Sequence, residues 1–249
     1  MMKKILVLVV MASAFFSLSA QKVNETVVLY GKEQIKGFTI NIYDNSSDIV
    51  EGALADKFET YYKLKGSKKK GYHVYENQTC DAFGDARYDI YFTTTEVGKK
   101  KDKTTQVVLV VSTGNLNCIT FANDPRSSRN IVAFLENLNK DIEAYKIKLR
   151  IEELRNNLNS LNKDRQSLLK EQTKLQEKRN ATDEEVKSLT QQIEQATSPE
   201  EKEPLQKNLK SAQKSLQNLE EKLYKIGVKL ETNQKDTDSA QKELDSLTK

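Results

Sequence analysis

The sequence has 249 residues, 31% charged side chains and a formal net charge of +4 at pH 7. Lys3 and Lys4 lie in an N-terminal leader that we expect to be removed, so the remaining chain is close to neutral. Bulk charge of this size does not favour an anionic partner, and we expect no nucleic acid to be bound.

The first 20 residues, MMKKILVLVVMASAFFSLSA, have the pattern of a secretory signal peptide. Two lysines precede an apolar run from Ile5 to Phe16, and small residues end at Ala20. We predict cleavage near Ala20 and an extracytoplasmic location, periplasmic or secreted. No later apolar run approaches the roughly 20 residues of a spanning helix, so no transmembrane segment is expected.

Composition divides the rest of the chain. Eight of the nine glycines precede Asp124 and all three prolines follow it. We predict an α+β globular domain over 21–127, a connecting helix packed on its sheet over 128–150, and an antiparallel coiled-coil hairpin over 151–249. The fold class is therefore a small two-layer α/β sandwich with a mainly antiparallel sheet, followed by a long helical hairpin.

The globular domain begins with alternating apolar residues, which predict half-buried strands over 26–30 and 38–43. Asp48 and Glu51 have capping-box spacing and predict the start of a helix that continues to about Leu64. Further strands are predicted from Tyr72, from Arg87 and from Thr104, with an edge strand over 116–121. Val107 to Val111 are consecutively apolar, which predicts a central strand covered on both faces.

Cys80 and Cys118 are the only cysteines. In an oxidising compartment this pair is the candidate for a structural disulfide. The alternative is two independent buried thiols, because sequence does not show whether the Cα atoms come within bridging distance.

No catalytic, metal-binding or cofactor-binding pattern is found, so we expect a non-enzymatic protein without cofactors. His73 is the only histidine and alternates with its neighbours as an ordinary strand residue. Asp81, Asp85 and Asp89 lack the spacing of a calcium loop and are interpreted as turn and surface acids.

Two lysine clusters are candidates for contact with an anionic surface such as lipid headgroups or envelope polymers. The alternative is that they are solvated loop tips that keep the sheet soluble. The clusters comprise Lys68, Lys69, Lys70, Lys99, Lys100 and Lys101.

The C-terminal part starts at NDPRSS, where Asp124 or a following serine is the candidate N-cap and Pro125 a first-turn proline. Beyond residue 150 the apolar residues follow the alternating three-and-four spacing of a coiled-coil seam. The predicted seam runs through Ile151, Leu154, Leu158, Leu161, Arg165, Leu168, Gln172, Leu175, Arg179, Thr182, Val186, Leu189, Ile193 and Ala196, then through Leu205, Leu209, Ala212, Leu216, Leu219, Leu223, Ile226, Leu230, Asn233, Thr237, Ala240, Leu244 and Leu247.

The stretch TSPEEKEPLQ interrupts this seam and predicts a turn over 198–204. Ser198, Pro199 and Glu201 resemble a capping box, but Pro204 opposes a helix through it, so we predict that the return helix starts at Pro204. The two seams then face each other, with Leu168 opposite Asn233. NATDEE at Asn180 is another capping sequence, but the seam stays in phase and predicts an unbroken helix.

The predicted tip comprises Ser198, Pro199, Glu200, Glu201 and Pro204. An exported domain with such a hairpin is expected to be a binding or scaffold protein in the cell envelope, with the hairpin as a spacer or interaction arm for a protein partner. Homo-oligomerisation is left open. The hairpin also resembles the tentacles of the trimeric periplasmic holdase family, which implies a chaperone as the alternative function. That family inserts its hairpin between strands, whereas here all predicted strands come first.

Overall fold

The structure is a computed structural model and describes residues 22–98 and 104–249. The predicted signal peptide and Lys99, Lys100 and Lys101 therefore lie outside the described residues. The chain divides into two compact units, with the boundary between Lys146 and Ile147, and each is described by itself. Over the described ranges, no helix has both the length and the apolarity needed to cross a bilayer.

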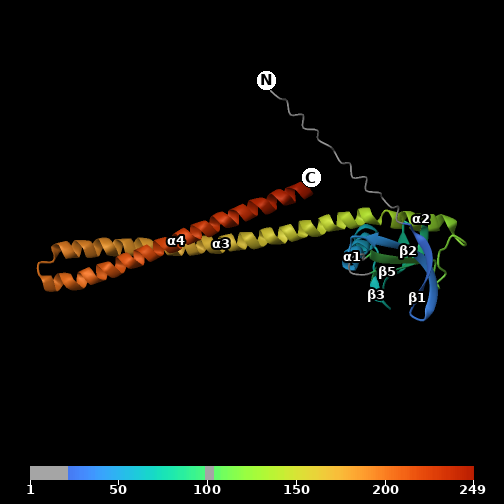
Figure 1. The fold of residues 1–249 in the computed structure, drawn as a ribbon, viewed down its shortest axis with the longest axis horizontal. Coiled ribbons are helices and arrows are strands. Elements are labelled where there is room, and N and C mark those ends of the chain that lie inside the picture. Colours follow the sequence, from blue (N-terminus) through green and yellow to red (C-terminus); the bar gives the residue numbers. More distant parts are fainter. Residues whose placement is uncertain (1–21, 99–103) are drawn as a thin grey trace, which may run out of the picture. The chain divides into compact units, whose positions relative to one another are not determined.

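The N-terminal unit, which we call the head, contains a six-stranded sheet in which all neighbouring strands are antiparallel (Figure 1). The strand order is β1-β2-β6-β5-β4-β3. The strands are β1 (Asn24–Tyr30), β2 (Glu33–Tyr43), β3 (Ser67–Lys69), β4 (Tyr72–Cys80), β5 (Gly84–Val97) and β6 (Thr104–Ser112). The predicted antiparallel sheet is confirmed. The edge strand predicted over 116–121 is wrong, because this segment makes only an isolated bridge from Cys118 to Ser112.

The head helices are α1 (Ser47–Asp56), which continues as the π-helix η1 (Lys57–Tyr61), then α2 (Pro125–Glu136) and the start of α3 (Leu138–Gln195). Asp124 caps α2 as predicted, because its Oδ1 accepts a hydrogen bond from the Ser127 amide at 3.0 Å. The predicted capping box at Asp48 is wrong, since Ser46 is the N-cap and makes no side-chain capping bond. The predicted continuous helix is broken at Asn137, between α2 and α3.

Strand β6 lies inside the sheet and supplies apolar side chains to both faces, as predicted. Val107, Leu109 and Val111 belong to the large core beneath the helices, while Val108 and Val110 belong to a smaller cluster on the opposite face. All five are buried. The head therefore has two hydrophobic layers, one on each side of the same sheet.

The smaller cluster is covered by the arm formed by β1 and the first half of β2. Only Phe38 to Tyr43 of β2 pair with β6, whereas Glu33 to Thr39 pair with β1. The Tyr30 ring, at the end of β1, lies 5.0 Å from the ring of Tyr91 in β5. The Tyr72 hydroxyl, in β4, donates to the Leu29 carbonyl at 3.1 Å. The arm thus bends across the sheet and contacts strands that are not its neighbours.

Gly37 lies where β2 leaves β6. A Cβ atom at this position would lie 2.6 Å from Val110 Cγ2 and 2.7 Å from the Leu109 carbonyl oxygen. Any side chain here would therefore separate the bent arm from β6, and glycine permits the close approach.

The C-terminal unit is a helical hairpin formed by α3, from Ile147 onward, and α4 (Pro199–Leu247) (Figure 1). The two helices run antiparallel and are linked by side-chain hydrogen bonds along their length. Every predicted seam position is buried or half-buried except Arg165, which is exposed. Helix α3 also continues through Asn180, so the predicted hairpin and its unbroken outgoing arm are confirmed.

The turn differs from the prediction. Only Ala196, Thr197 and Ser198 separate the two helices, and Pro204 lies inside α4. Pro204 cannot donate to the carbonyl of Glu200, but both residues are exposed in the first turns of α4, where water can satisfy that carbonyl. The local cost of Pro204 is therefore smaller than in a buried helix, and the predicted start at Pro204 is wrong.

The earlier turn also changes the pairing between the arms. Arg165, predicted to lie opposite Thr237, donates to Gln234. The amide of Asn233 donates to the Leu161 carbonyl at 3.0 Å, one heptad away from the predicted partner Leu168. The return helix is therefore displaced along α3 relative to the predicted register.

Substituting Gly37 by alanine should destabilise the head by about 1–3 kcal/mol, because the new methyl group overlaps Val110 and the β6 backbone. Thermal unfolding followed by near-UV circular dichroism tests this, since nine of the ten tyrosines precede residue 147. Gly227→Ala is the control, because a Cβ there meets nothing within 4 Å. Gly227 lies in the hairpin unit, so this substitution should leave the unfolding of the head unchanged, while it stabilises α4 by about 1 kcal/mol. Equal effects of the two substitutions would contradict the role assigned to Gly37.

The observed register predicts that Leu161→Cys combined with Asn233→Cys forms a disulfide within one chain, because the Asn233 amide already reaches the Leu161 backbone carbonyl. Leu168→Cys combined with Asn233→Cys, the pair of the predicted register, should not, because position 168 lies one heptad, about 10 Å, further along α3. Non-reducing electrophoresis after mild oxidation separates the two outcomes, with the unsubstituted chain treated in parallel. Efficient bridging of the 168/233 pair would contradict this register.

Candidate functional site

The two cysteines do not form the predicted disulfide, and both are free thiols. Cys80 ends β4 and lies in the core beneath the helices, whereas Cys118 lies in the cluster on the opposite face. The sheet separates them, so the disulfide prediction is wrong and the alternative of two buried thiols applies. Burial raises the pKa of Cys80 to about 11 and also raises that of Cys118, so neither is an activated nucleophile.

The described lysines of the predicted anionic-contact surface already have partners within the head. Lys68 Nζ lies 2.5 Å from Glu51 Oε1, and Lys69 Nζ lies 2.7 Å from Glu76 Oε2. The ammonium of Lys70 lies 4.3 Å from the centre of the Tyr30 ring. These contacts reduce the positive charge available to a ligand, because two of the three ammonium groups are neutralised locally.

Glu51 lies at the centre of a polar network that the sequence did not predict. Its Oε1 atom is 2.8 Å from His73 Nε2 as well as 2.5 Å from Lys68 Nζ. Hydrogen bonds from Lys68 and then His73 lower the pKa of Glu51 below its ordinary value of 4.5. The His73 ring stacks on Phe92, with centroids 4.5 Å apart and an interplanar angle of 2°. Glu51 therefore fastens α1 to strands β3 and β4.

The register of the sheet explains why these residues meet. Lys68, His73 and Phe92 lie opposite one another in adjacent strands, in one row across the helix-covered face. Helix α1 passes over this row and supplies Glu51. His73 lies in strand β4, as predicted, and its ring contacts both Phe92 and Glu51.

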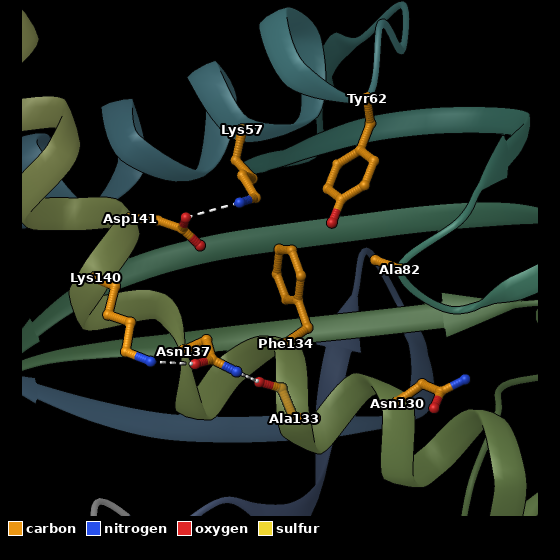
Figure 2. A pocket seen from close by; sticks show the side chains of 9 residues that line it. All are labelled: Lys57, Tyr62, Ala82, Asn130, Ala133, Phe134, Asn137, Lys140 and Asp141. Atoms are coloured by element: carbon orange, nitrogen blue, oxygen red, sulfur yellow. Dashed lines mark hydrogen bonds and ion pairs between the residues drawn. The ribbon is translucent and has the colours of Figure 1, made fainter.

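A hollow of about 440 Å³ lies between η1 and the helices α2 and α3 (Figure 2). Lys57 Nζ donates to Asp141 Oδ1 at 2.7 Å, which ties η1 to α3. Figure 2 shows the Phe134 ring and the Tyr62 hydroxyl pointing toward the middle of the hollow. The lining residues are Lys57, Tyr62, Ala82, Asn130, Ala133, Phe134, Asn137, Lys140 and Asp141.

Two of the charged groups that line this hollow pair with each other. The side chains of Lys57 and Asp141 neutralise each other, and the Lys57 ammonium also lies 4.6 Å from the centre of the exposed Tyr61 ring. Burial, as the largest cause, raises the pKa of Tyr62 to about 12, so its hydroxyl remains protonated at neutral pH. Among residues 22–98 and 104–249, no group of three or more His, Cys, Asp or Glu side chains is arranged to hold a metal ion.

The predicted hairpin tip is a capped helix start. Ser198 is the N-cap of α4, and its Oγ accepts a hydrogen bond from the Glu201 amide at 3.3 Å. The Glu201 carboxylate reaches back to the Thr197 amide at 3.2 Å. Pro199 occupies the first turn and Glu200 adds a second acid there, which suits the positive end of the helix dipole. These residues therefore have a structural role that accounts for the acidic sequence.

Of the acids predicted to lie in turns or on the surface, Asp81 and Asp85 are exposed, whereas Asp89 is half-buried in β5. Asp89 Oδ1 accepts from the Asn77 amide at 2.7 Å, where the pairing of β4 and β5 shifts register. Asn77 has a positive φ of 52°, so Asp89 stabilises an irregular backbone. Asp81 lines a shallow surface hollow beside Tyr61 and Tyr62.

Replacing Glu51 by glutamine should lower the stability of the head at pH 7 by about 1 kcal/mol, because two hydrogen bonds to a charged group are weakened. A lowered pKa means that the carboxylate stabilises the fold above pH 4.5 and loses this effect as the pH falls through its folded-state value. The difference between variant and wild type should therefore shrink in acid. Unfolding measured between pH 7 and pH 3 tests this.

Glu76→Gln is the matched control, because Glu76 pairs with Lys69 on the surface with more than half of its side chain exposed. It should change stability little at any pH. A pH dependence that is the same in both variants would contradict the central role of Glu51.

Comparison with known proteins gave no match. No protein-family model matches the chain, and no curated protein or solved structure does so. The function is therefore argued from the arrangement of the described residues.

Proposed function

We propose that this chain is an exported, non-enzymatic binding or scaffold protein of the cell envelope that uses its helical hairpin as a spacer or protein-interaction arm. One observation carries the proposal. The predicted seam of each arm is covered by the other arm, with Arg165 as the exposed exception. The hairpin therefore needs no partner chain to cover its seam, and its outer faces remain available for other contacts.

The dimensions and charges of the hairpin support this role. Helix α4 has 49 residues, which corresponds to about 74 Å at 1.5 Å per residue. Exposed ion pairs within single helices, such as Lys225 with Glu221 and Lys235 with Glu231, keep the outer faces polar and balanced in charge. An arm of this length can hold two bound components tens of ångströms apart.

Features inside the hairpin favour a single, fixed alignment of the arms. Arg150 donates to both carboxylate oxygens of Glu243, at 2.7 and 3.0 Å, where α4 ends. Asn233 is buried in the seam and bonded to the Leu161 carbonyl. A buried asparagine of this kind fixes register at a cost in stability, which suits a spacer of defined length.

The holdase alternative requires a broad apolar surface for unfolded clients. The hairpin exposes few large apolar side chains, namely Ile147, Leu169, Tyr224 and Val228. All described strands also precede the hairpin in the sequence. These observations favour a scaffold that holds defined partners.

Site-specific photo-crosslinking in intact cells tests the proposal. A photoreactive residue replaces Lys170 or Glu200, which are exposed on the hairpin, and Leu175 in the seam serves as the control. A scaffold should give one or a few defined partners from the two exposed positions and only products within the chain from position 175. N-terminal sequencing of the mature protein, expected to start near Gln21, tests export.

Crosslinks to many unrelated unfolded envelope proteins would favour the holdase alternative. Failure to capture any partner from either exposed position would contradict the interaction arm. A chain that retains residues 1–20 and stays in the cytoplasm would contradict export.

A further inference from the structure

One exposed face of α4 differs from the rest of the hairpin surface because it combines two apolar side chains with a regular pattern of charges. Tyr224 is 74% exposed and Val228 is 45% exposed, although the seam of the same helix passes through the buried Ile226 between them. Residues on this face recur every three or four positions, so they share one side of the helix, away from α3. We call it the α4 outer face; it comprises Glu221, Tyr224, Lys225, Val228, Glu231, Thr232 and Lys235.

The charged positions on the α4 outer face are symmetric about Val228, and the two members of each symmetric pair have opposite charges. Glu221 lies seven positions before Val228 and Lys235 seven positions after it, while Lys225 and Glu231 lie three positions before and after it. Reversing the direction of the helix therefore puts a base where there was an acid, and an acid where there was a base. A face with this property is complementary to an antiparallel copy of itself.

We propose that a second copy of the chain docks on the α4 outer face, with the two α4 helices antiparallel and a two-fold axis near Val228. Each Glu221 then meets Lys235 of the second copy, and each Lys225 meets Glu231 of the second copy. Such an isologous contact uses the same patch on both subunits, as two-fold dimers require. Four interhelical ion pairs then surround a centre formed by the two valines and tyrosines.

The side chains are already arranged for this contact. Glu221 Oε1 and Lys225 Nζ are 2.6 Å apart, and Glu231 Oε1 and Lys235 Nζ are 2.7 Å apart, with more than 60% of each side chain exposed. The ion pairs within each helix hold the charged groups near the positions from which they would contact the second copy. Docking then extends two existing pairs into a network instead of ordering four free side chains.

Gly227 provides space beside the apolar centre. A Cβ atom at this position would meet nothing within 4 Å, so the surface next to Tyr224 is open. Glycine in the interior of an exposed helix costs about 1 kcal/mol relative to alanine. The open surface at Gly227 can receive an apolar side chain of the second copy. The contact made there would offset the helix-propensity cost of the glycine.

A second copy fits the α4 outer face better than a lipid or nucleic-acid surface does. The face carries two acids and two bases, so a uniformly anionic surface would be repelled as much as attracted. One helix face is small compared with the roughly 1,600 Å² of a standard interface, so the association should be weak and sensitive to salt. The inference is independent of export and of the partner proposed for the hairpin.

Sedimentation equilibrium of the full chain tests the dimer with charge variants designed in pairs. Glu221→Lys with Glu231→Lys makes the face entirely basic, and Lys225→Glu with Lys235→Glu makes it entirely acidic. Each variant alone should associate at least about tenfold more weakly than wild type, because like charges then meet across the axis. A mixture of the two should regain association, since every contact again joins opposite charges.

The variant with all four substitutions restores the symmetry with the signs exchanged, so it should self-associate like wild type. Asp183→Lys is the matched control, because it breaks the ion pair with Lys187 on α3, away from the α4 outer face, and should leave association unchanged. Far-UV circular dichroism verifies that each variant keeps its helices. Tyr224→Ala should weaken association without altering its charge dependence.

A wild-type chain that stays monomeric at the highest soluble concentration would overturn the proposal. So would a dimer that the basic and acidic variants form as readily as wild type, or one that the mixture fails to restore. Equal loss of association in the Asp183→Lys variant would show that general charge, and not the α4 outer face, controls it. Binding of the monomer to anionic vesicles that is lost in the entirely acidic variant would assign the face to a membrane and would also overturn the proposal.

Discussion

The head is organised by the need to cover both faces of β6. Val107 to Val111 are consecutively apolar, so the strand places buried side chains on both sides of the sheet. Helices α1, α2 and α3 cover one side, and the bent β1–β2 arm covers the other. The bend depends on Gly37, because the arm passes so close to β6 that no side chain fits between them. Tyr30 at the end of the arm then completes the second layer against Tyr91.

The same requirement explains why the cysteines do not pair. Cys80 and Cys118 serve as buried apolar residues on opposite sides of the sheet, each in the layer that its strand or loop supplies. Glu51 and Lys57 have a related structural function, because each joins a helix to a neighbouring element through a charged side chain at the edge of the core. The polar groups that resemble a site thus hold the helices of the head against the sheet and against each other.

The two helices of the hairpin bury their apolar seam residues against each other. The seam of α3 lies against the seam of α4, so the hairpin itself, without a partner chain, covers the residues that a single rod would expose. This arrangement leaves the outer faces polar, with acids and bases paired along each helix. On a surface with balanced charge, only a local pattern of charge and shape can distinguish one region from another. The symmetric arrangement of acids and bases around Val228 is such a pattern.

The sequence by itself determined the main elements. Alternation and the apolar run of β6 predicted the sheet, and the three-and-four spacing predicted the hairpin, because these periods follow directly from strand and helix geometry. The sequence also limited the cap of α2 to Asp124 or a following serine, because capping depends on neighbouring residues, and the structure shows that Asp124 is the cap.

Only the tertiary structure decided which distant residues meet. The arm bent at Gly37, the contact of Glu51 with His73, and the separation of the two cysteines all depend on which elements pack together. The register of the hairpin depends on whether the cap at Ser198 or the restriction at Pro204 determines the start of α4. These outcomes are balances between competing contacts across the fold, and the spacing of residues along the chain does not contain them.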